Sequence, residues 1–373
     1  MNTPPSWSGS TSLLVFKPRP SRPAPRQTVG IIGWSRANLF NGWFNSLLTL
    51  LVLYLLWKTV PPFVRWALFD SLWISDGTAC QKTDGACWSV VTANLRFITF
   101  GFFPHDLQWR PLLAMLILIA MLFYSRNRKH WKNSLAYTWA VALIVMGLLM
   151  KGGLFGLAPV ESTQWGGLPL TLLLSVFGLT AAYPLGVVLA LGRRSRMPAI
   201  KTLCVIYIEL IRGVPLISLL FMSSIMFPLF LPEGVTIDKV LRAQVAIILF
   251  TAAYIAEVVR GGLQAMPRGQ FEAADSLGLN YNQTMRLIIL PQALKIVIPP
   301  SLGILLSAFK DTSLVVIIAL YDVLKTTKVT LSNPKWTGYS TEAYIFLAVL
   351  YFICCYAMSS YSRKLEKSLH TGR

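Results

Sequence analysis

The sequence predicts an all-α integral membrane protein with about eight transmembrane helices. Three observations carry this prediction. Of the 373 residues, 54% are hydrophobic and only 13% are charged, and the apolar residues form blocks long enough to cross the roughly 30 Å core of a lipid bilayer. The formal net charge of +19 would indicate nucleic-acid binding in a soluble protein. Here the basic residues follow the topology of membrane loops instead, so we expect a lipid environment and no nucleic-acid partner.

The charge-free stretches define the spans, and the charges between them define the orientation. We expect spans at 37–57, 108–125, 133–150, 167–191, 202–230, 243–261, 294–318 and 343–362. Clusters of Lys and Arg precede the first span and follow the second and the fourth, whereas the intervening loops carry mixed charges. Because basic clusters mark cytoplasmic loops, this alternation predicts that both termini lie in the cytoplasm.

The chain divides by composition into three parts. Residues 1–36 are rich in Pro, Ser and Arg, and we expect a disordered, basic cytoplasmic arm that contacts anionic lipid; a dedicated partner-binding role is the alternative. Residues 37–160 contain additional transmembrane helices and an outward, periplasmic loop at 58–107. Residues 161–373 form the C-terminal core, in which a cytoplasmic loop at 262–293 joins two spans.

Two cysteines, Cys80 and Cys87, lie in the outward loop among Gly and Asp residues that favour turns. These turns could bring the two sulfurs together in an oxidising compartment, so a disulfide and a pair of free thiols are both open. Earlier in the same loop, the aromatic spacing over 61–75 predicts an interfacial helix. No spacing of Cys and His indicates a metal site.

The most informative stretch is FEAADSLGLNYNQTMRLIILPQAL, residues 271–294, which separates two long apolar runs. The chain has three histidines and lacks the Gly-Lys dipeptide of a phosphate-binding loop, so we expect no ATP hydrolysis here. The tripeptide Glu-Ala-Ala begins a short helix whose small side chains permit close approach of another surface. Gly278 ends this helix, and Pro291 sets the entry into the next span. The pattern predicts a loop helix that transmits a partner's motion to the membrane helices.

At these residues the chain resembles the permease subunits of ABC importers. Their loop signature is Glu-Ala-Ala, three residues, Gly, nine residues, Ile, one residue and Leu-Pro, and it is present in full. The flanking stretches YIAEVVRGGLQAMPRGQ, ILPQALKIVIPP and FKDTSLVVII resemble the polar amino acid subgroup. The stretch IELIRGVPLI, with the preceding GGLPLTLLLSVFGLTAAYPLG, looks most like the M-type subunit of general L-amino-acid importers. The resemblance is strong over residues 165–320.

The resemblance implies a type I importer permease core in the C-terminal half of a bacterial inner-membrane protein. In that family, a periplasmic binding protein delivers the amino acid, two permease subunits form the pathway, and two ATPase subunits receive the loop helix in a groove. ATP and Mg²⁺ are then bound by the partner ATPase, and this chain binds no cofactor or metal. The resemblance further implies a heterodimer with a second permease subunit and import of L-amino acids with broad, polar-type specificity.

Carried over to this sequence, the resemblance assigns the docking helix to named residues. They are Glu272, Ala273, Ala274 and Gly278. Asp275 departs from the family, because many members have a small apolar residue there. This departure adds negative charge to the expected docking surface.

Charged residues inside spans are the next candidates, because burying charge in a membrane is costly. Glu209 and Arg212 lie in the fifth span, and Glu257 and Arg260 lie in the sixth. Each pair has i,i+3 spacing, so each can form an ion pair on its own helix, and both fall toward the cytoplasmic side, where the two pairs can meet. Three roles are open: locking the helix packing, forming a cytoplasmic gate, or contacting substrate.

Two further features of the spans predict pathway residues. Gly213 and Pro215 interrupt the fifth span directly after a charged residue, which frees backbone groups that a cavity or a neighbouring helix must satisfy. The seventh span carries polar groups at Lys310, Asp311, Thr312 and Ser313. These groups can recognise the carboxylate and ammonium of an amino acid. Alternatively, the Lys and Asp neutralise each other and support the packing of two permease subunits.

An ion-coupled secondary amino acid transporter is the alternative function. Such transporters typically show inverted repeats and unpaired acids near the middle of the membrane. Here the acids have basic partners close in sequence, and no repeat is evident. A membrane scaffold without transport activity would explain the spans but not the loop signature.

Overall fold

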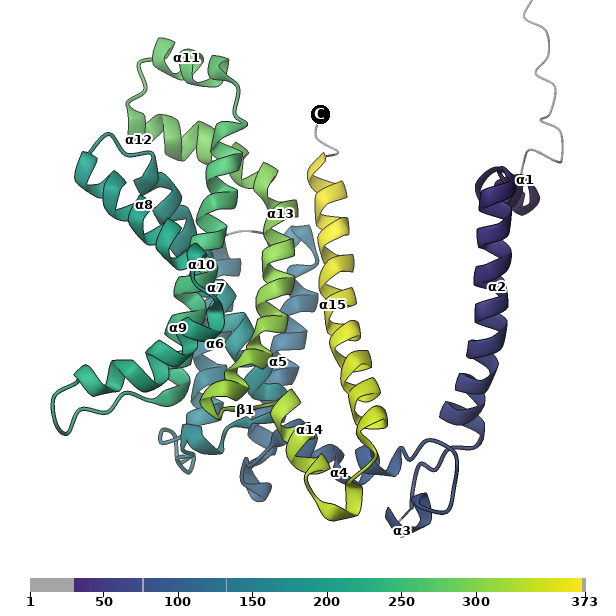
Figure 1. The fold of residues 1–373 in the computed structure, drawn as a ribbon. Coiled ribbons are helices and arrows are strands. Elements are labelled where there is room, and N and C mark those ends of the chain that lie inside the picture. Colours follow the sequence, from purple (N-terminus) through teal and green to yellow (C-terminus); the bar gives the residue numbers. More distant parts are fainter. Residues whose placement is uncertain (1–29, 76, 132, 371–373) are drawn as a thin grey trace, which may run out of the picture. The chain divides into compact units, whose positions relative to one another are not determined.

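The computed structural model describes residues 30–75, 77–131 and 133–370, and regular structure in this part of the chain is almost entirely helical (Figure 1). Seven of the described helices are long and apolar enough to cross a membrane, and one sharply bent helix pair would make an eighth span. The predicted all-α membrane fold with about eight spans is therefore confirmed.

The chain consists of two compact units, and the first ends at Phe69, inside the predicted region 37–160. The described part of this unit contains α1 (Gly30–Asn38) and a span. The span is α2 (Trp43–Val64) followed by a π-helical turn (Arg65–Phe69). Apolar side chains occur on every face of α2, as expected for a helix in lipid.

The first span is longer than predicted and begins later, because it covers Trp43–Phe69 rather than 37–57. Pro61 and Pro62 lie inside it without ending it. The backbone N–H of Arg65 donates to the carbonyl oxygens of both prolines, and the helix continues as a π turn. Backbone groups in a membrane must find partners within their own segment, which favours a local adjustment over a break.

Two other expectations for this region differ from the described structure. Residues 30–36 were expected to be disordered, but they lie in α1. The remainder of the predicted arm, residues 1–29, lies outside the described residues. The interfacial helix predicted over 61–75 is helical only up to Phe69, where it continues the helix of the first span, and residues 70–75 are not helical.

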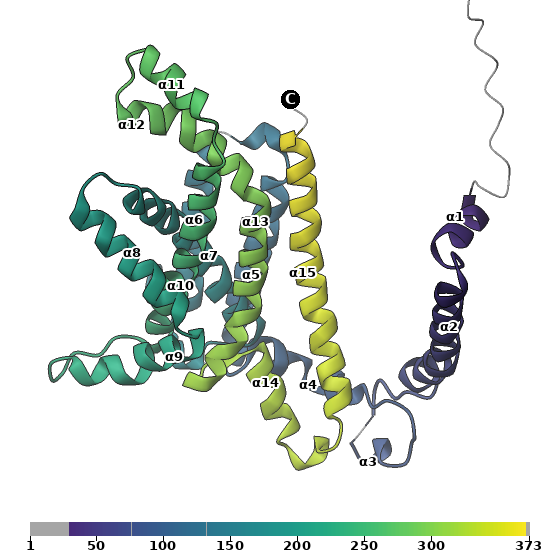
Figure 2. The same ribbon diagram turned by 45° about the horizontal axis from the view of Figure 1, so that its top comes forward.

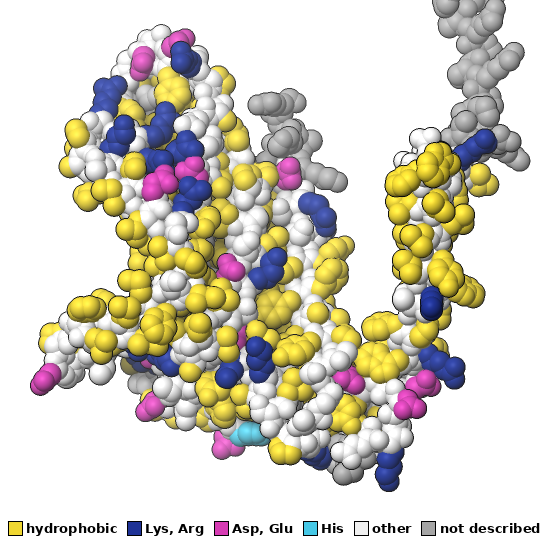
Figure 3. All heavy atoms as spheres, in the orientation of Figure 1, with side chains coloured by type: hydrophobic (Ala, Val, Ile, Leu, Met, Phe, Trp, Pro, Cys, Tyr) yellow, Lys and Arg dark blue, Asp and Glu magenta, His cyan; other side chains and the backbone are white. Residues whose placement is uncertain are grey.

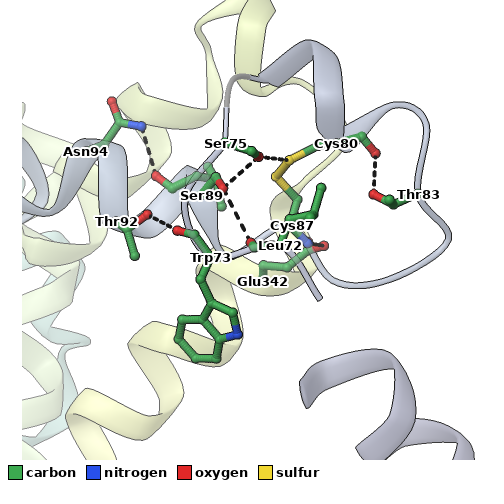
Figure 4. Close-up of a disulfide and its surroundings, with 11 residues drawn as sticks. Leu72, Trp73, Ser75, Cys80, Thr83, Cys87, Ser89, Thr92, Asn94 and Glu342 are labelled. Atoms are coloured by element: carbon green, nitrogen blue, oxygen red, sulfur yellow. Dashed lines mark hydrogen bonds between the residues drawn. A yellow bond between two sulfur atoms is a disulfide. The ribbon is translucent and has the colours of Figure 1, made fainter. Parts of the chain in front are cut away.

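The second unit begins with a small loop that contains α3 (Gly77–Cys80) and is closed by a disulfide between Cys80 and Cys87 (Figure 4). The backbone N–H of Cys87 donates to Oε1 of Glu342 at 3.0 Å. Glu342 is buried and belongs to the last helix, α15 (Ser340–His370). Both cysteines also pack against Trp336. These contacts attach the loop to the C-terminal part of the chain.

The next two spans, which precede the core, are joined by a buried arginine. These spans are α5 (Trp109–Ser125) and α6 (Asn133–Lys151), and they confirm the predicted second and third spans. A shorter helix, α4 (Ser89–Phe100), comes before them. Arg110 is fully buried, and its guanidinium donates to the carbonyl oxygens of Leu149 and Ala158, both at 2.7 Å. Leu149 lies in the last turn of α6, where the helix dipole favours a positive charge.

The centre of the second unit is the pair α7 (Gly167–Arg193) and α10 (Lys239–Gln264), which pack side by side (Figures 1 and 2). Both are spans predicted from the sequence. Small residues permit their close approach: a Cβ added at Gly186 would lie 2.7 Å from Cγ2 of Ile255. This helix pair provides the buried core against which the other core helices pack.

The predicted fifth span, 202–230, is not one straight helix. It is split into α8 (Pro198–Gly213) and a segment that begins with α9 (Leu216–Phe221), and the two parts are bent by 104°. The break lies at Gly213 and Pro215, where the sequence predicts an interruption. Proline has no N–H to continue the α8 hydrogen-bond ladder, so the helix ends there. The interruption is confirmed, and the single continuous crossing is wrong.

The seventh span begins earlier than predicted, because a helical stretch runs over Tyr281–Ile318 rather than 294–318. Its parts are α12 (Tyr281–Gln283), a π-helical segment (Thr284–Ile289), α13 (Leu290–Asp311) and a 3₁₀ segment (Thr312–Ile318). Pro291 consequently lies inside the span and not at its entry. The π-helical segment directly precedes it, which accommodates the missing N–H of the proline.

After this span the chain forms a two-residue strand, β1 (Tyr321–Asp322), which bridges in parallel to the beginning of α7, and then α14 (Val323–Leu331). Asp322 is fully buried and caps α14, accepting two backbone N–H groups of its first turn at 2.9 and 3.3 Å. Burial raises the pKa of Asp322 to about 6, although these N–H donors oppose the rise. No motif in the sequence singles out this residue.

Replacing Asp322 by asparagine is expected to change how stability depends on pH. A carboxyl whose pKa rises from 3.8 to about 6 on folding binds its proton more tightly in the native state. This group therefore makes the wild-type protein lose roughly 1–3 kcal/mol of stability as the pH rises from about 4 to about 6. Asparagine still caps the helix but does not titrate. The Tm of the variant relative to wild type should rise across this interval, and parallel pH profiles would contradict the expectation.

Candidate functional site

The predicted loop helix is α11 (Arg268–Ser276), which lies beyond the ends of α10 and α13 (Figures 1 and 2). It ends in a Schellman motif: the N–H of Leu279 donates to the carbonyl of Ala274 at 3.1 Å, and that of Gly278 donates to Asp275 at 2.9 Å. Gly278 has a φ of +70°, a left-handed conformation that glycine adopts without strain. The helix therefore ends where the sequence predicts.

The proposed docking residues are not all on the same face of α11. Glu272, Ala273 and Asp275 are exposed, whereas Ala274 is fully buried. An outward surface with two carboxylates and a methyl group between them is therefore available to a partner. Ala274 faces the chain's own core, so its contribution is to seat the helix rather than to contact another subunit.

Helix α11 is attached to the spans by packing and by a hydrogen bond that sequence analysis missed. Phe271 packs against the main core cluster, which includes Met285. The side chain of Gln292, near the start of α13, donates from Nε2 to Oε1 of Gln270 at 3.1 Å and to the carbonyl of Ile288 at 3.0 Å. These contacts join α11 to the start of α13. The only sequence signal was a glutamine on each side of the loop.

Replacing Gly278 by alanine is expected to loosen the end of α11. An added Cβ would meet no atom within 4 Å, so the cost comes from the positive φ alone and is about 1 kcal/mol. Limited proteolysis of the purified protein should then cut within 262–293 severalfold faster. Gly269 is the matched control, because it also lies in α11 with open space around it but has no positive φ. Gly269→Ala should not accelerate cleavage; equal acceleration by both variants would contradict the expectation.

A cluster of charged side chains lies at the same end of the second unit as α11 (Figure 3) and joins three helices. Its centre is Glu257 of α10. This carboxylate pairs with Arg260, with Arg193 of α7 at 3.3 Å and with Arg212 of α8 at 3.6 Å. The side chains of these four residues are only 22–32% exposed. A single glutamate therefore fixes α7, α8 and α10 to one another.

The predicted pairing within this cluster is half right. Arg260 pairs with Glu257 on its own helix, as the i,i+3 spacing predicts. Glu209 does not pair with Arg212, because Arg193 approaches it from α7 at 2.9 Å. Arg212 instead turns toward α10, where its guanidinium lies 5.6 Å from the ring centroid of Tyr254 in addition to its contact with Glu257. The two pairs do meet, as the sequence suggested, and Arg193 is the member it missed.

The candidate residues of the seventh span lie at the end of α13 opposite α11. Lys310 is exposed, Asp311 is half-buried, and no ion pair joins these two described residues. Consecutive residues on a helix point about 100° apart, which disfavours a direct ion pair between these neighbours. The charge of Lys310 still acts on Asp311, so their mutual neutralisation stays a prediction. Thr312 is buried and donates to the carbonyl of Phe309 at 2.7 Å. Ser313 is partly buried, and none of the four contacts the Glu257 cluster by a hydrogen bond or ion pair.

Metal binding has no candidate within the described ranges, where no group of three or more His, Cys, Asp or Glu side chains could hold an ion. The candidate site therefore consists of an exposed helix and a cluster of ion pairs.

The chain is similar to a family model, to named proteins and to a solved structure. Residues 182–371 match the family model of the binding-protein-dependent transport system inner membrane component. The chain is 48% identical to the inner membrane amino-acid ABC transporter permease protein YhdY of Escherichia coli (strain K12), over 96% of this chain and 98% of that protein. It is 38% identical to the glutamate/glutamine/aspartate/asparagine transport system permease protein BztC of Rhodobacter capsulatus, over the same shares. A crystal structure of an amino acid ABC transporter with histidines is 31% identical, spans 54% of this chain and 92% of its own, and has a TM-score of 0.49.

Proposed function

This chain belongs to the amino-acid ABC transporter permeases, and we propose that it forms part of the pathway by which an ATP-driven importer moves L-amino acids from periplasm to cytoplasm. It is a multi-pass inner-membrane permease subunit and not an enzyme, and ATP is hydrolysed by a partner ATPase. The observation that carries the proposal is α11: an exposed acidic helix fixed to the ends of two spans.

We propose that α11 is the coupling element, with Glu272, Ala273 and Asp275 facing the ATPase. Two features of the geometry support this role. The outward face has small and acidic side chains that no described residue pairs with, and the inward face is bound to α13 through Gln270 and Gln292. Motion of a docked subunit would therefore act on a span without an intervening flexible loop.

We further propose that the Glu257 cluster is a gate at the cytoplasmic end of the pathway. It joins three helices through ion pairs that are only partly exposed, and it lies beside the break at Gly213 and Pro215, where a helix can change direction. Ion pairs of this kind can break and re-form between two helix arrangements. Lys310, Asp311, Thr312 and Ser313 stay candidates for contact with the substrate's ammonium and carboxylate near the opposite end.

The partners follow from the class of transporter. ABC permeases of this family work with an ATPase and a binding protein, and we propose two ATPase copies, which bind ATP and Mg²⁺, and one periplasmic amino-acid-binding protein. We propose a heterodimer with a second permease subunit of related sequence. The inner-membrane names of the relatives support the cellular location.

The substrate is proposed to be a broad range of L-amino acids. One relative is named for glutamate, glutamine, aspartate and asparagine, and another for amino acids in general. Names that cover acidic and amide side chains together support recognition of the shared α-carboxylate and α-ammonium, with loose space for the side chain.

Purification of the tagged full-length chain from its native membrane in mild detergent, followed by mass spectrometry, tests the proposal. We expect an ATPase, a second permease and an amino-acid-binding protein to co-purify. In proteoliposomes of this complex, uptake of labelled amino acids should require ATP on the ATPase side. Uptake driven by an ion gradient, with no ATPase bound, would overturn the proposal and favour the ion-coupled alternative.

A further inference from the structure

A groove of about 590 Å³ lies between α4 and the beginning of α5, outside the Glu257 cluster and α11. Its lining is mostly apolar and includes Leu95, Phe100 and Leu112. Arg96 and Gln108 add polar groups. The groove is preformed, because the opposite face of α4 is buried against α14 and α15. Its volume falls within the range of small-molecule sites.

Arg96 is held in a fixed position at this groove. Its Nε donates to Oε1 of Gln108, and its Nη2 donates to the carbonyl of His105 at 3.1 Å. Gln108 is itself 93% buried and anchored, because its Nε2 donates to the carbonyl of Phe103 at 3.1 Å. The other N–H groups of Arg96 have no partner among the described residues, and no described carboxylate pairs with it. An oriented cation with unused donors is a site for an anion.

The position of this cation along the chain indicates which anion it meets. His105, which Arg96 contacts, is the first residue of the apolar span His105–Ser125. Trp109 follows within the span, lines the groove and is half exposed, as aromatic residues at a membrane interface commonly are. In a bilayer, a cation at the end of a span lies at the level of the headgroups, where phospholipid phosphates are the neighbouring anions, and apolar surface within the span faces acyl chains.

We propose that this groove binds one membrane phospholipid. Its phosphodiester accepts hydrogen bonds from Arg96, and one acyl chain lies along Leu95 and Leu112. The apolar lining supports a lipid over free phosphate, which would leave most of the groove unfilled. The proposal is independent of the transport function, because none of these residues belongs to α11 or to the Glu257 cluster.

Native mass spectrometry of the delipidated full-length chain, titrated with dioleoyl phosphatidylglycerol, tests this site. Arg96→Gln should raise the dissociation constant of the first lipid about tenfold, because it removes charge-assisted hydrogen bonds. Leu112→Trp should fill the groove and weaken the first binding event to a similar extent. Unchanged first-lipid affinity in both variants would overturn the proposal.

Control variants and ligands separate this site from nonspecific binding. Lys82→Gln removes one exposed positive charge elsewhere, and Leu122→Trp adds the same bulk to an exposed position near the other end of α5. Neither should change the affinity. Titration with inorganic phosphate and with oleate gives the two halves of the ligand separately, and each should bind more weakly than the phospholipid. Inorganic phosphate bound as tightly as the lipid, with no effect of Leu112→Trp, would also overturn the proposal.

Discussion

Replacing Glu272 by lysine is expected to abolish ATP-driven amino acid uptake while leaving the amount of protein in the membrane unchanged. Glu272 is exposed on α11 and makes no ion pair with any described residue, so reversing its charge removes no contact that stabilises the fold. The substitution instead weakens the docking of the ATPase. Like charges brought together across an interface cost several kcal/mol, which is enough to reduce docking a hundredfold or more.

Uptake into proteoliposomes and ATP hydrolysis stimulated by the binding protein measure this effect. Both should fall to background in Glu272→Lys. Glu233→Lys provides the control, because it reverses the same charge at an exposed position in the loop before α10. It should transport normally. Normal uptake by Glu272→Lys, with normal protein levels, would show that α11 is not the coupling element.

Replacing Glu257 by glutamine is expected to have the second-largest effect. Arg193, Arg212 and Arg260 would lose the carboxylate they share, in a site that is only partly exposed. Removing one member of a fully buried ion pair costs about 3–5 kcal/mol, and partial exposure reduces this to about 2 kcal/mol. If the cluster is a gate, Glu257→Gln destabilises the closed form of that gate by this free energy. ATP hydrolysis without substrate should therefore rise, and coupled uptake should fall.

The neighbouring acid separates a gate from general loss of charge. Among the described residues, Glu209 forms one ion pair, with Arg193, and is 55% exposed, so Glu209→Gln should cost no more than about 1 kcal/mol and leave coupling intact. The double variant Glu257→Gln with Arg260→Gln restores the charge balance and should recover part of the coupling. Equal loss of uptake in Glu209→Gln and Glu257→Gln, without a rise in basal ATP hydrolysis, would contradict the role as a gate.

Local sequence signals predicted the spans and the loop helix. Apolar blocks locate most spans because the thickness of the bilayer sets the length of a helix that crosses it. The end of α11 follows from Gly278, because its left-handed conformation is a local property that glycine favours. The break at Pro215 is also local, but its angle of 104° is not, because it depends on what α9 packs against.

Contacts between residues far apart in the chain could not be predicted from one sequence. The i,i+3 rule paired Glu209 with Arg212, and the competing Arg193 lies on another helix that only the fold brings near. The same holds for Gln270 and Gln292, which are 22 residues apart and lie on different helices. The bounds of spans 37–57 and 294–318 were misplaced for a different reason. The first prediction followed a charge-free stretch and stopped before Lys58, which lies inside α2. The other took Pro291 as the entry into the span, whereas a π-helical segment carries the helix past this proline.

Site-directed cross-linking from Ala273 tests the central claim, coupling through α11, most directly. Ala273→Cys in the purified complex would carry a photoreactive maleimide, with the unmodified chain as the background for its native thiols. Leu229→Cys is the control, because this residue is 79% exposed and lies outside α11. We predict a covalent product with the ATPase subunit from Ala273→Cys and none from Leu229→Cys. A transport-competent complex that gives no ATPase product from Ala273→Cys would contradict the assignment of α11 as the docking helix.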